Sequence, residues 1–161
     1  MPYWQLFYHL VWATKNREPL LTQQAEPVIY DFLRAKAIGL GATVFALNGV
    51  EDHVHMVASI PPAISLSRFV GQVKAAASAR LNKSQMSAEH FSWQNEYAVF
   101  SLDRTRLKDH IAYVERQKKH HAQGTMIPEL ERLRGEAARP QSDDTDRTKP
   151  DSSGAVLQPW H

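Results

Sequence analysis

The chain has 161 residues, 43% of them hydrophobic, and a formal net charge of only +2. This length predicts one domain with room for a tail, and the complete lack of cysteine excludes disulfides and thiolate metal sites. Any metal must therefore be held by histidine, carboxylate, amide or water ligands. No secretory signal and no apolar run of membrane-spanning length is visible, so we expect a cytoplasmic protein without a membrane partner, associated with the nucleoid when it binds DNA.

The charges are unevenly distributed along the chain. Residues 139–161 hold three cations against four carboxylates, which leaves residues 1–138 more basic than the whole chain. A basic body is compatible with a nucleic-acid partner, and it is equally compatible with solvated helix faces. The polar composition of residues 139–161 predicts a disordered tail behind a single domain at 1–138.

A run of aromatic and β-branched residues at positions 3–13 predicts the first strand. Both of its faces are apolar apart from His9, which indicates a central strand covered on both sides, with His9 as a satisfied core histidine. A polar turn follows at positions 15–19. Thr22 is expected to cap a helix that reaches about Ile38.

The rest of the chain predicts two strands, a helix, an interrupted strand, a long helix and a short final helix, in the order 43–48, 52–60, 66–81, 91–102, 103–123 and from Pro128 onward. The Asn48-Gly49 dipeptide predicts the turn of a hairpin between the first two of these strands. The order β-α-β-β-α-β followed by a helix matches an α+β, ferredoxin-like antiparallel sheet with an added C-terminal helix. That fold hosts many functions, so function must be argued from a site.

Two histidines, His53 and His55, flank one apolar residue in the predicted strand 52–60. Side chains alternate across a strand, so both imidazoles are expected on one face, with Val54 in the opposite layer. Two neutral imidazoles on one face can converge on a metal ion. The pair is also compatible with packed core histidines, so a metal site requires further ligands elsewhere in the chain.

The predicted third helix carries Tyr113 and Gln117, which are one helical turn apart and share a face. A phenol ordinarily keeps its proton, but its oxygen can act as a nucleophile beside a metal-bound phosphate. Outside that context, Tyr113 is a filler of an amphipathic helix. The two readings remain open on the residues of the helix alone.

Four sequence blocks, taken in order, resemble the single-tyrosine HUH transposases of small bacterial insertion sequences, the insertion-sequence-two-hundred-like group whose relatives include REP-associated tyrosine transposases. The blocks are Tyr8 to Arg17, Asp52 to Val57, Trp93-Gln94 with Tyr97 to Ser101, and Tyr113 to His121. An HxH pair alone is unspecific, but the four blocks in this order are specific to the family. The resemblance covers nearly all of residues 1–138.

The resemblance implies that His53 and His55 are the HUH metal ligands, that Gln117 is the third protein ligand, and that Tyr113 is the nucleophile. It implies Mg²⁺ or Mn²⁺ as cofactor and single-stranded DNA with hairpin ends as partner. Strands would be cut and rejoined at insertion-sequence ends through a 5′-phosphotyrosine intermediate. In this family the tyrosine helix is often supplied in trans, so a homodimer is expected.

Polar and basic side chains outside this site are candidates for DNA contact, either at phosphates or along a hairpin backbone. Their alternative is a solvated turn or helix face. The candidates are Lys15, Asn16, Arg17, Arg68, Lys74, Arg80 and Arg116.

Two other functions are compatible with parts of the sequence. A rolling-circle type nicking enzyme would use similar chemistry, but such enzymes are typically larger than this chain. A non-catalytic or host-adopted nucleic-acid-binding module would keep the sheet and use His53 and His55 only for packing. The presence of Tyr113 and Gln117 argues against the second alternative.

Overall fold

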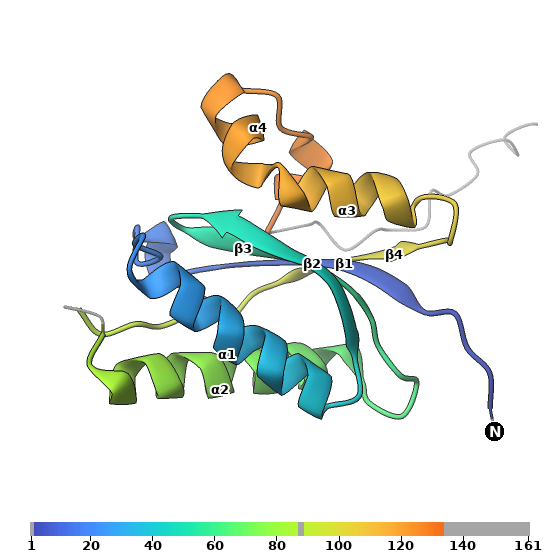
Figure 1. Ribbon diagram of the computed structural model, residues 1–161, viewed down its shortest axis with the longest axis horizontal. Helices are drawn as coiled ribbons and strands as arrows, with labels where there is room; N and C mark the ends of the chain where they lie inside the picture. The colour runs from blue at the N-terminus through green and yellow to red at the C-terminus, as the bar shows by residue number, and fades with distance from the viewer. Residues whose placement is uncertain (1, 87–88, 134–161) are drawn as a thin grey trace, which may run out of the picture.

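The computed structural model describes residues 2–86 and 89–133. A four-stranded sheet separates two layers of helices, with α1 and α2 on one face and α3 and α4 on the other (Figure 1). The elements in chain order are β1 (Phe7–Ala13), η1 (Lys15–Arg17), α1 (Ala25–Gly39), β2 (Thr43–Val50), β3 (His53–Ser59), α2 (Leu66–Ser84), β4 (Ala98–Leu102), α3 (Leu107–Glu115), α4 (Gln117–Gln123) and η2 (Pro128–Glu131). Among these helices, none is both long and apolar enough to cross a bilayer.

The sheet is antiparallel throughout, in the order β2-β3-β1-β4. This arrangement confirms the α+β, ferredoxin-like prediction and the central position predicted for the first strand. The predicted interruption of the fourth strand is also present, because an isolated bridge between Thr14 and Trp93 precedes β4.

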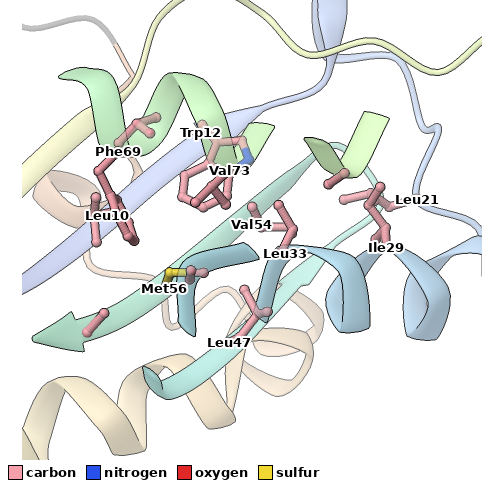
Figure 2. Packing of buried hydrophobic residues seen from close by; sticks show 14 of the residues in the cluster. Leu10, Trp12, Leu21, Ile29, Leu33, Leu47, Val54, Met56, Phe69 and Val73 are labelled. Atoms are coloured by element: carbon pink, nitrogen blue, oxygen red, sulfur yellow. The ribbon is translucent and has the colours of Figure 1, made fainter. Parts of the chain in front are cut away.

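The main hydrophobic core lies between the sheet and the α1–α2 layer (Figure 2). Leu10 and Trp12 of β1 and Val54 and Met56 of β3 point into it and are fully buried. Alternation along a strand then turns the intervening residues of β1 and β3 toward α3 and α4. This is why the predicted histidine face of β3 lies against the layer formed by α3 and α4.

The hairpin between β2 and β3 turns later than its sequence predicts. Asn48 and Gly49 lie inside β2, paired with His55 and Val54, and the turn falls at positions 51–52. Gly49 is needed for close approach rather than for a turn, because a Cβ atom there would lie 2.1 Å from the His53 carbonyl oxygen. Cross-strand pairing therefore overrides the local turn preference of the Asn-Gly dipeptide.

The predicted helix 103–123 is divided into α3 and α4 at Arg116, whose backbone leaves helical geometry (φ −101°, ψ 17°). Asp103 caps the first turn, since its Oδ1 accepts hydrogen bonds from the Thr105 and Arg106 amides at 2.9 and 3.1 Å. The Thr22 cap is present too, with Oγ1 accepting from the Ala25 amide at 3.2 Å. The predicted tail at 139–161 and the boundary at 138 lie outside the described residues.

Candidate active site

His53 and His55 lie on β3 and face the α3–α4 layer, with 2% and 0% of their surfaces exposed. The His53 ring is oriented by Asp52, whose Oδ1 lies 2.6 Å from His53 Nδ1. With Nδ1 hydrogen-bonded to a carboxylate, Nε2 is the nitrogen of His53 that is available to a ligand. The strand thus places two imidazoles side by side, as its alternation predicts, with ring centroids 5.1 Å apart.

Tyr113 of α3 reaches the same place from the opposite layer. Its hydroxyl donates a 2.5 Å hydrogen bond to Glu131 Oε1 and accepts one of 3.1 Å from the Ile127 amide. The ring is 6% exposed and lies over His55, with centroids 6.0 Å apart. One chain therefore brings the predicted nucleophile together with the two predicted histidine ligands.

Glu131, in η2, connects the tyrosine to the histidines. Its second oxygen, Oε2, lies 2.9 Å from His53 Nε2 and 3.3 Å from His55 Nε2. The two imidazoles and this carboxylate each offer an atom within 4.8 Å of the others, a donor set able to hold a metal ion. His121 of α4 is a further neighbour, with Nε2 3.5 Å from the same oxygen.

Sequence reasoning missed Glu131. The residue follows Tyr113 by 18 positions, across the end of α4 at Gly124, and no periodic pattern connects the two. The signal available was a predicted short helix opened by Pro128 with acidic residues in its single turn. His121 is a partly buried neighbour of His53, with ring centroids 4.9 Å apart.

Gln117 begins α4 one turn after Tyr113 and is completely buried. Neither its amide oxygen nor its amide nitrogen has a hydrogen-bond partner among the described residues. A buried polar atom without a partner costs about 1–3 kcal/mol. Two such atoms on one completely buried side chain fit a polar or cationic ligand.

The charges of this cluster follow from its contacts. Burial alone would lower the pKa of His53, but hydrogen bonds and charge from Asp52 and Glu131 outweigh it and raise the pKa. Burial lowers the pKa of His55. Burial would raise the pKa of Glu131, but hydrogen bonds from His53 and His55 hold it far below its usual range. Burial, followed by the contact with Glu131, raises the pKa of Tyr113. The resting site thus pairs a carboxylate with a neutral phenol.

The predicted DNA-binding residues are dispersed around this site. Lys15, Asn16 and Arg17 form the exposed η1 turn, where Asn16 and Arg17 have φ of 55° and 53°. Arg17 Nη1 lies 3.4 Å from Asp52 Oδ2, which ties the turn to the support of His53. Arg116 is exposed at the junction of α3 and α4.

The α2 candidates lie on the other side of the sheet from Tyr113 (Figure 1). Arg68 and Arg80 are exposed, and the Arg80 guanidinium lies over the Phe32 ring at 5.7 Å. Lys74 is buried and its ammonium group donates to the carbonyl oxygens of Gln94 and Glu96, so its charge is engaged inside the protein.

Comparison with known proteins identifies the family of the chain. Residues 2–117 match the family described as Transposase IS200 like. The chain belongs to this family. The match confirms the resemblance carried by the four sequence blocks and supports a DNA transposase function. It ends at Gln117, so Glu131 lies beyond the matched residues.

Relatives of the IS200-like family show the same likeness. The ISDra2 transposase TnpA of Deinococcus radiodurans is 27% identical over 119 residues, covering 71% of this chain and 85% of that protein. The transposase of insertion sequence element IS200 from Salmonella typhimurium is 28% identical over 92 residues, which is 57% of this chain and 60% of the relative.

Solved structures agree on the fold. A putative transposase from Deinococcus radiodurans R1 superposes with a TM-score of 0.58 at 26% identity, over 73% of this chain and 95% of its own. A REP-associated tyrosine transposase bound to a REP hairpin gives a TM-score of 0.56 at 11% identity, over 78% of this chain and 76% of its own. The second likeness supports the fold alone.

Proposed function

We propose that this IS200-like transposase cuts and rejoins single-stranded DNA at insertion-sequence ends, with Tyr113 as nucleophile and a 5′-phosphotyrosine intermediate. The observation that carries the proposal is the convergence of Tyr113 with His53 and His55 on the single carboxylate of Glu131. A merely structural tyrosine has no need to meet two buried imidazoles. A nucleophile that attacks a phosphodiester beside a metal ion must lie close to the imidazoles that hold the ion.

The covalent step uses Tyr113 directly. Its Oη attacks the scissile phosphorus, the bond from phosphorus to the 3′-oxygen breaks, and the DNA 5′-phosphate becomes linked to the tyrosine. Glu131 Oε1 already accepts the hydroxyl hydrogen at 2.5 Å, so it orients the nucleophile and stands where the phenol proton leaves. A free 3′-hydroxyl later attacks the phosphotyrosine, restores Tyr113 and rejoins DNA. Bond energy is retained, so no nucleotide cofactor is needed.

The buried donors fit a divalent cation. We assign the imidazoles of His53 and His55 and the side chain of Gln117 as its ligands, because Gln117 is wholly buried and both amide atoms lack partners among the described residues. Glu131 adds a carboxylate oxygen near both imidazoles. Oxygen and imidazole ligands suit Mg²⁺ or Mn²⁺. When bound, such an ion supplies positive charge that offsets the charge of the scissile phosphate.

The DNA partner is proposed to be a single strand with hairpin ends. The family resemblance suggests this choice, and exposed basic side chains on η1, α2 and the α3–α4 junction are compatible with it. We also propose a homodimer in which the tyrosine helix can be exchanged between subunits, as the family resemblance suggests. The complete set of Tyr113, His53 and His55 within one chain gives that exchange a defined starting arrangement.

The test is formation of a covalent adduct. The full chain is incubated with single-stranded hairpin oligonucleotides from the ends of its own element and with Mg²⁺ or Mn²⁺, and products are separated under denaturing conditions. Wild type should give a denaturation-stable protein–DNA adduct, Tyr113→Phe should give none, and chelation should abolish it. Tyr8→Phe is the matched control, because Tyr8 packs on the opposite face of the same sheet.

Absence of adduct from wild type, or an equal yield from Tyr113→Phe, refutes the nucleophile. Adduct that survives chelation refutes the metal role. Tight hairpin binding without any adduct would instead identify a non-catalytic nucleic-acid-binding module.

A further inference from the structure

A second layer of histidines lies behind His55. His9, at the centre of β1, is completely buried, and its Nε2 lies 2.8 Å from His55 Nδ1. Its other nitrogen, Nδ1, lies 2.8 Å from Nδ1 of His110 on α3. Three imidazoles from three elements therefore form one continuous chain of hydrogen bonds that ends at the candidate metal site.

The chemistry of neutral imidazole makes this chain directional. Each neutral ring carries one N–H donor and one acceptor nitrogen. His9 is completely buried and each of its nitrogens faces another imidazole, an environment that favours the neutral ring and accordingly lowers its pKa. His9 must then donate to one neighbour and accept from the other, and its tautomer fixes which nitrogen each neighbour presents.

The group that faces His55 Nε2 selects the direction. In this structure that group is the Glu131 carboxylate, whose Oε2 accepts at 3.3 Å, so His55 carries its proton on Nε2. His55 Nδ1 is then an acceptor, His9 donates to it through Nε2, and His110 donates to His9. Coordination of a divalent ion at His55 Nε2 requires that nitrogen to be unprotonated, which reverses all three assignments.

We propose that His9 is a positioning residue that couples the tautomer of His55 to that of His110, and that the donor order along the three rings reverses when a divalent ion binds. The proposal rests on the proposed function, because it assigns His55 to the metal. The proton balance closes: one proton leaves from His55 Nε2, one enters at His110 Nε2, and each ring keeps one proton throughout.

The coupling distinguishes the two HUH histidines. His53 is backed by the carboxylate of Asp52 at 2.6 Å, the usual support for a ligating histidine. His55 is backed by a neutral ring instead. His9 therefore supplies orientation without adding negative charge behind the metal.

The first test reads tautomers directly in wild-type protein. Imidazole nitrogen chemical shifts are recorded on the full chain labelled with ¹⁵N-histidine, first with chelator and then with Mg²⁺. The Mg²⁺ concentration is one that displaces bound Mn²⁺ in a separate titration. We expect His9 to carry its proton on Nε2 with chelator and on Nδ1 with Mg²⁺. An unchanged His9 tautomer, or a doubly protonated ring, overturns the proposal.

The second test measures Mn²⁺ binding by the signal of free Mn²⁺ in electron paramagnetic resonance. His9→Leu leaves His55 Nδ1 without a partner and should weaken Mn²⁺ binding about 10-fold to 100-fold, the usual effect of losing such support. His9→Gln can accept through its amide oxygen and donate through its amide nitrogen, so it should stay within about threefold of wild type. Equal losses in the two variants indicate packing alone and overturn the proposal.

The two hypotheses fail differently. If His55→Ala binds Mn²⁺ as tightly as wild type, the metal assignment in the proposed function is wrong. If His55→Ala loses Mn²⁺ but His9→Leu keeps it, the metal assignment stands and the role of His9 is refuted.

Discussion

Gly49 links the hairpin to the candidate metal site, and its replacement by alanine gives the sharpest test of the β2–β3 packing. A Cβ atom at this position would lie 2.1 Å from the His53 carbonyl oxygen and 2.9 Å from Val54 Cα. Both neighbours are backbone atoms of the paired strand, so no flexible side chain can move aside. The strands must separate by about 1 Å to restore ordinary contact.

The expected cost of Gly49→Ala follows from overpacking a tightly fitted interior, at about 2–3 kcal/mol. For a chain of this size about 1 kcal/mol lowers Tm by roughly 3 °C, so Gly49→Ala should lower Tm by about 6–9 °C. The same displacement moves His53, and sites of this kind tolerate errors of only about 0.5 Å. Mn²⁺ binding should therefore weaken as well.

The assay is thermal unfolding followed by circular dichroism in chelator, with Mn²⁺ titration on the folded variants. Gly71→Ala is the matched control, since Gly71 lies inside α2 and a Cβ atom there meets nothing within 4 Å. That change should stabilise the protein by about 0.5–1 kcal/mol through helix propensity. A Gly49→Ala protein that melts within 2 °C of wild type would refute the steric argument.

Three further predictions concern the site and its supports. Gln117→Leu should raise the free energy of unfolding in chelator by about 1–2 kcal/mol, because it removes two buried amide atoms that lack hydrogen-bond partners among the described residues. The same change should abolish Mn²⁺ binding. A loss of stability would show that the amide group is hydrogen-bonded in solution. The raised pKa of His53 contributes stability that is fully present below about pH 6.5 and is lost as the pH rises through the pKa of the folded state. The free energy of unfolding, measured in chelator, should therefore fall above about pH 6.5. His53→Gln should reduce this dependence of the free energy on pH. Lys118 Nζ contacts Glu26 Oε1 at 2.7 Å, Asn48 Oδ1 at 2.7 Å and the Gly49 carbonyl oxygen at 3.1 Å. Lys118→Met should therefore speed amide hydrogen exchange in α4 and lower the free energy of unfolding by at most about 1 kcal/mol. Lys119→Met, at the next exposed position, is the control and should leave the exchange rates unchanged.

The parts of the site that depend on local periodicity could be predicted from the sequence. His53 and His55 share a face because strand alternation is a local rule, and the opposite placement of Val54 and Met56 in the main core confirms it. The central position of β1 follows from apolar residues on both of its faces. The Asn48-Gly49 turn was wrong because pairing of Asn48 with His55 extends β2 past the local signal.

The contacts of the site that join residues far apart in the sequence could not be predicted. Glu131 enters the site only after the chain reverses beyond Gly124, and its sequence distance from His53 carries no pattern. The contacts of His9 with two other imidazoles depend on the order of the strands and on the position of α3. The sequence supported burial of His9, which is confirmed, but it held no sign of the two imidazoles that satisfy the ring.

The helix break at Arg116 allows α3 and α4 to place their side chains together over the histidines of the sheet. In an unbroken α-helix, residues seven positions apart are separated by about 10.5 Å along the axis. The rings of Tyr113 and His120 are nevertheless stacked, with centroids 4.7 Å apart and planes 26° apart. The break therefore bends α4 back over the end of α3, so that His121 lies beside the strand that carries His53. A substitution that makes 107–123 one continuous helix should separate these rings and weaken Mn²⁺ binding without disturbing the core beneath the sheet.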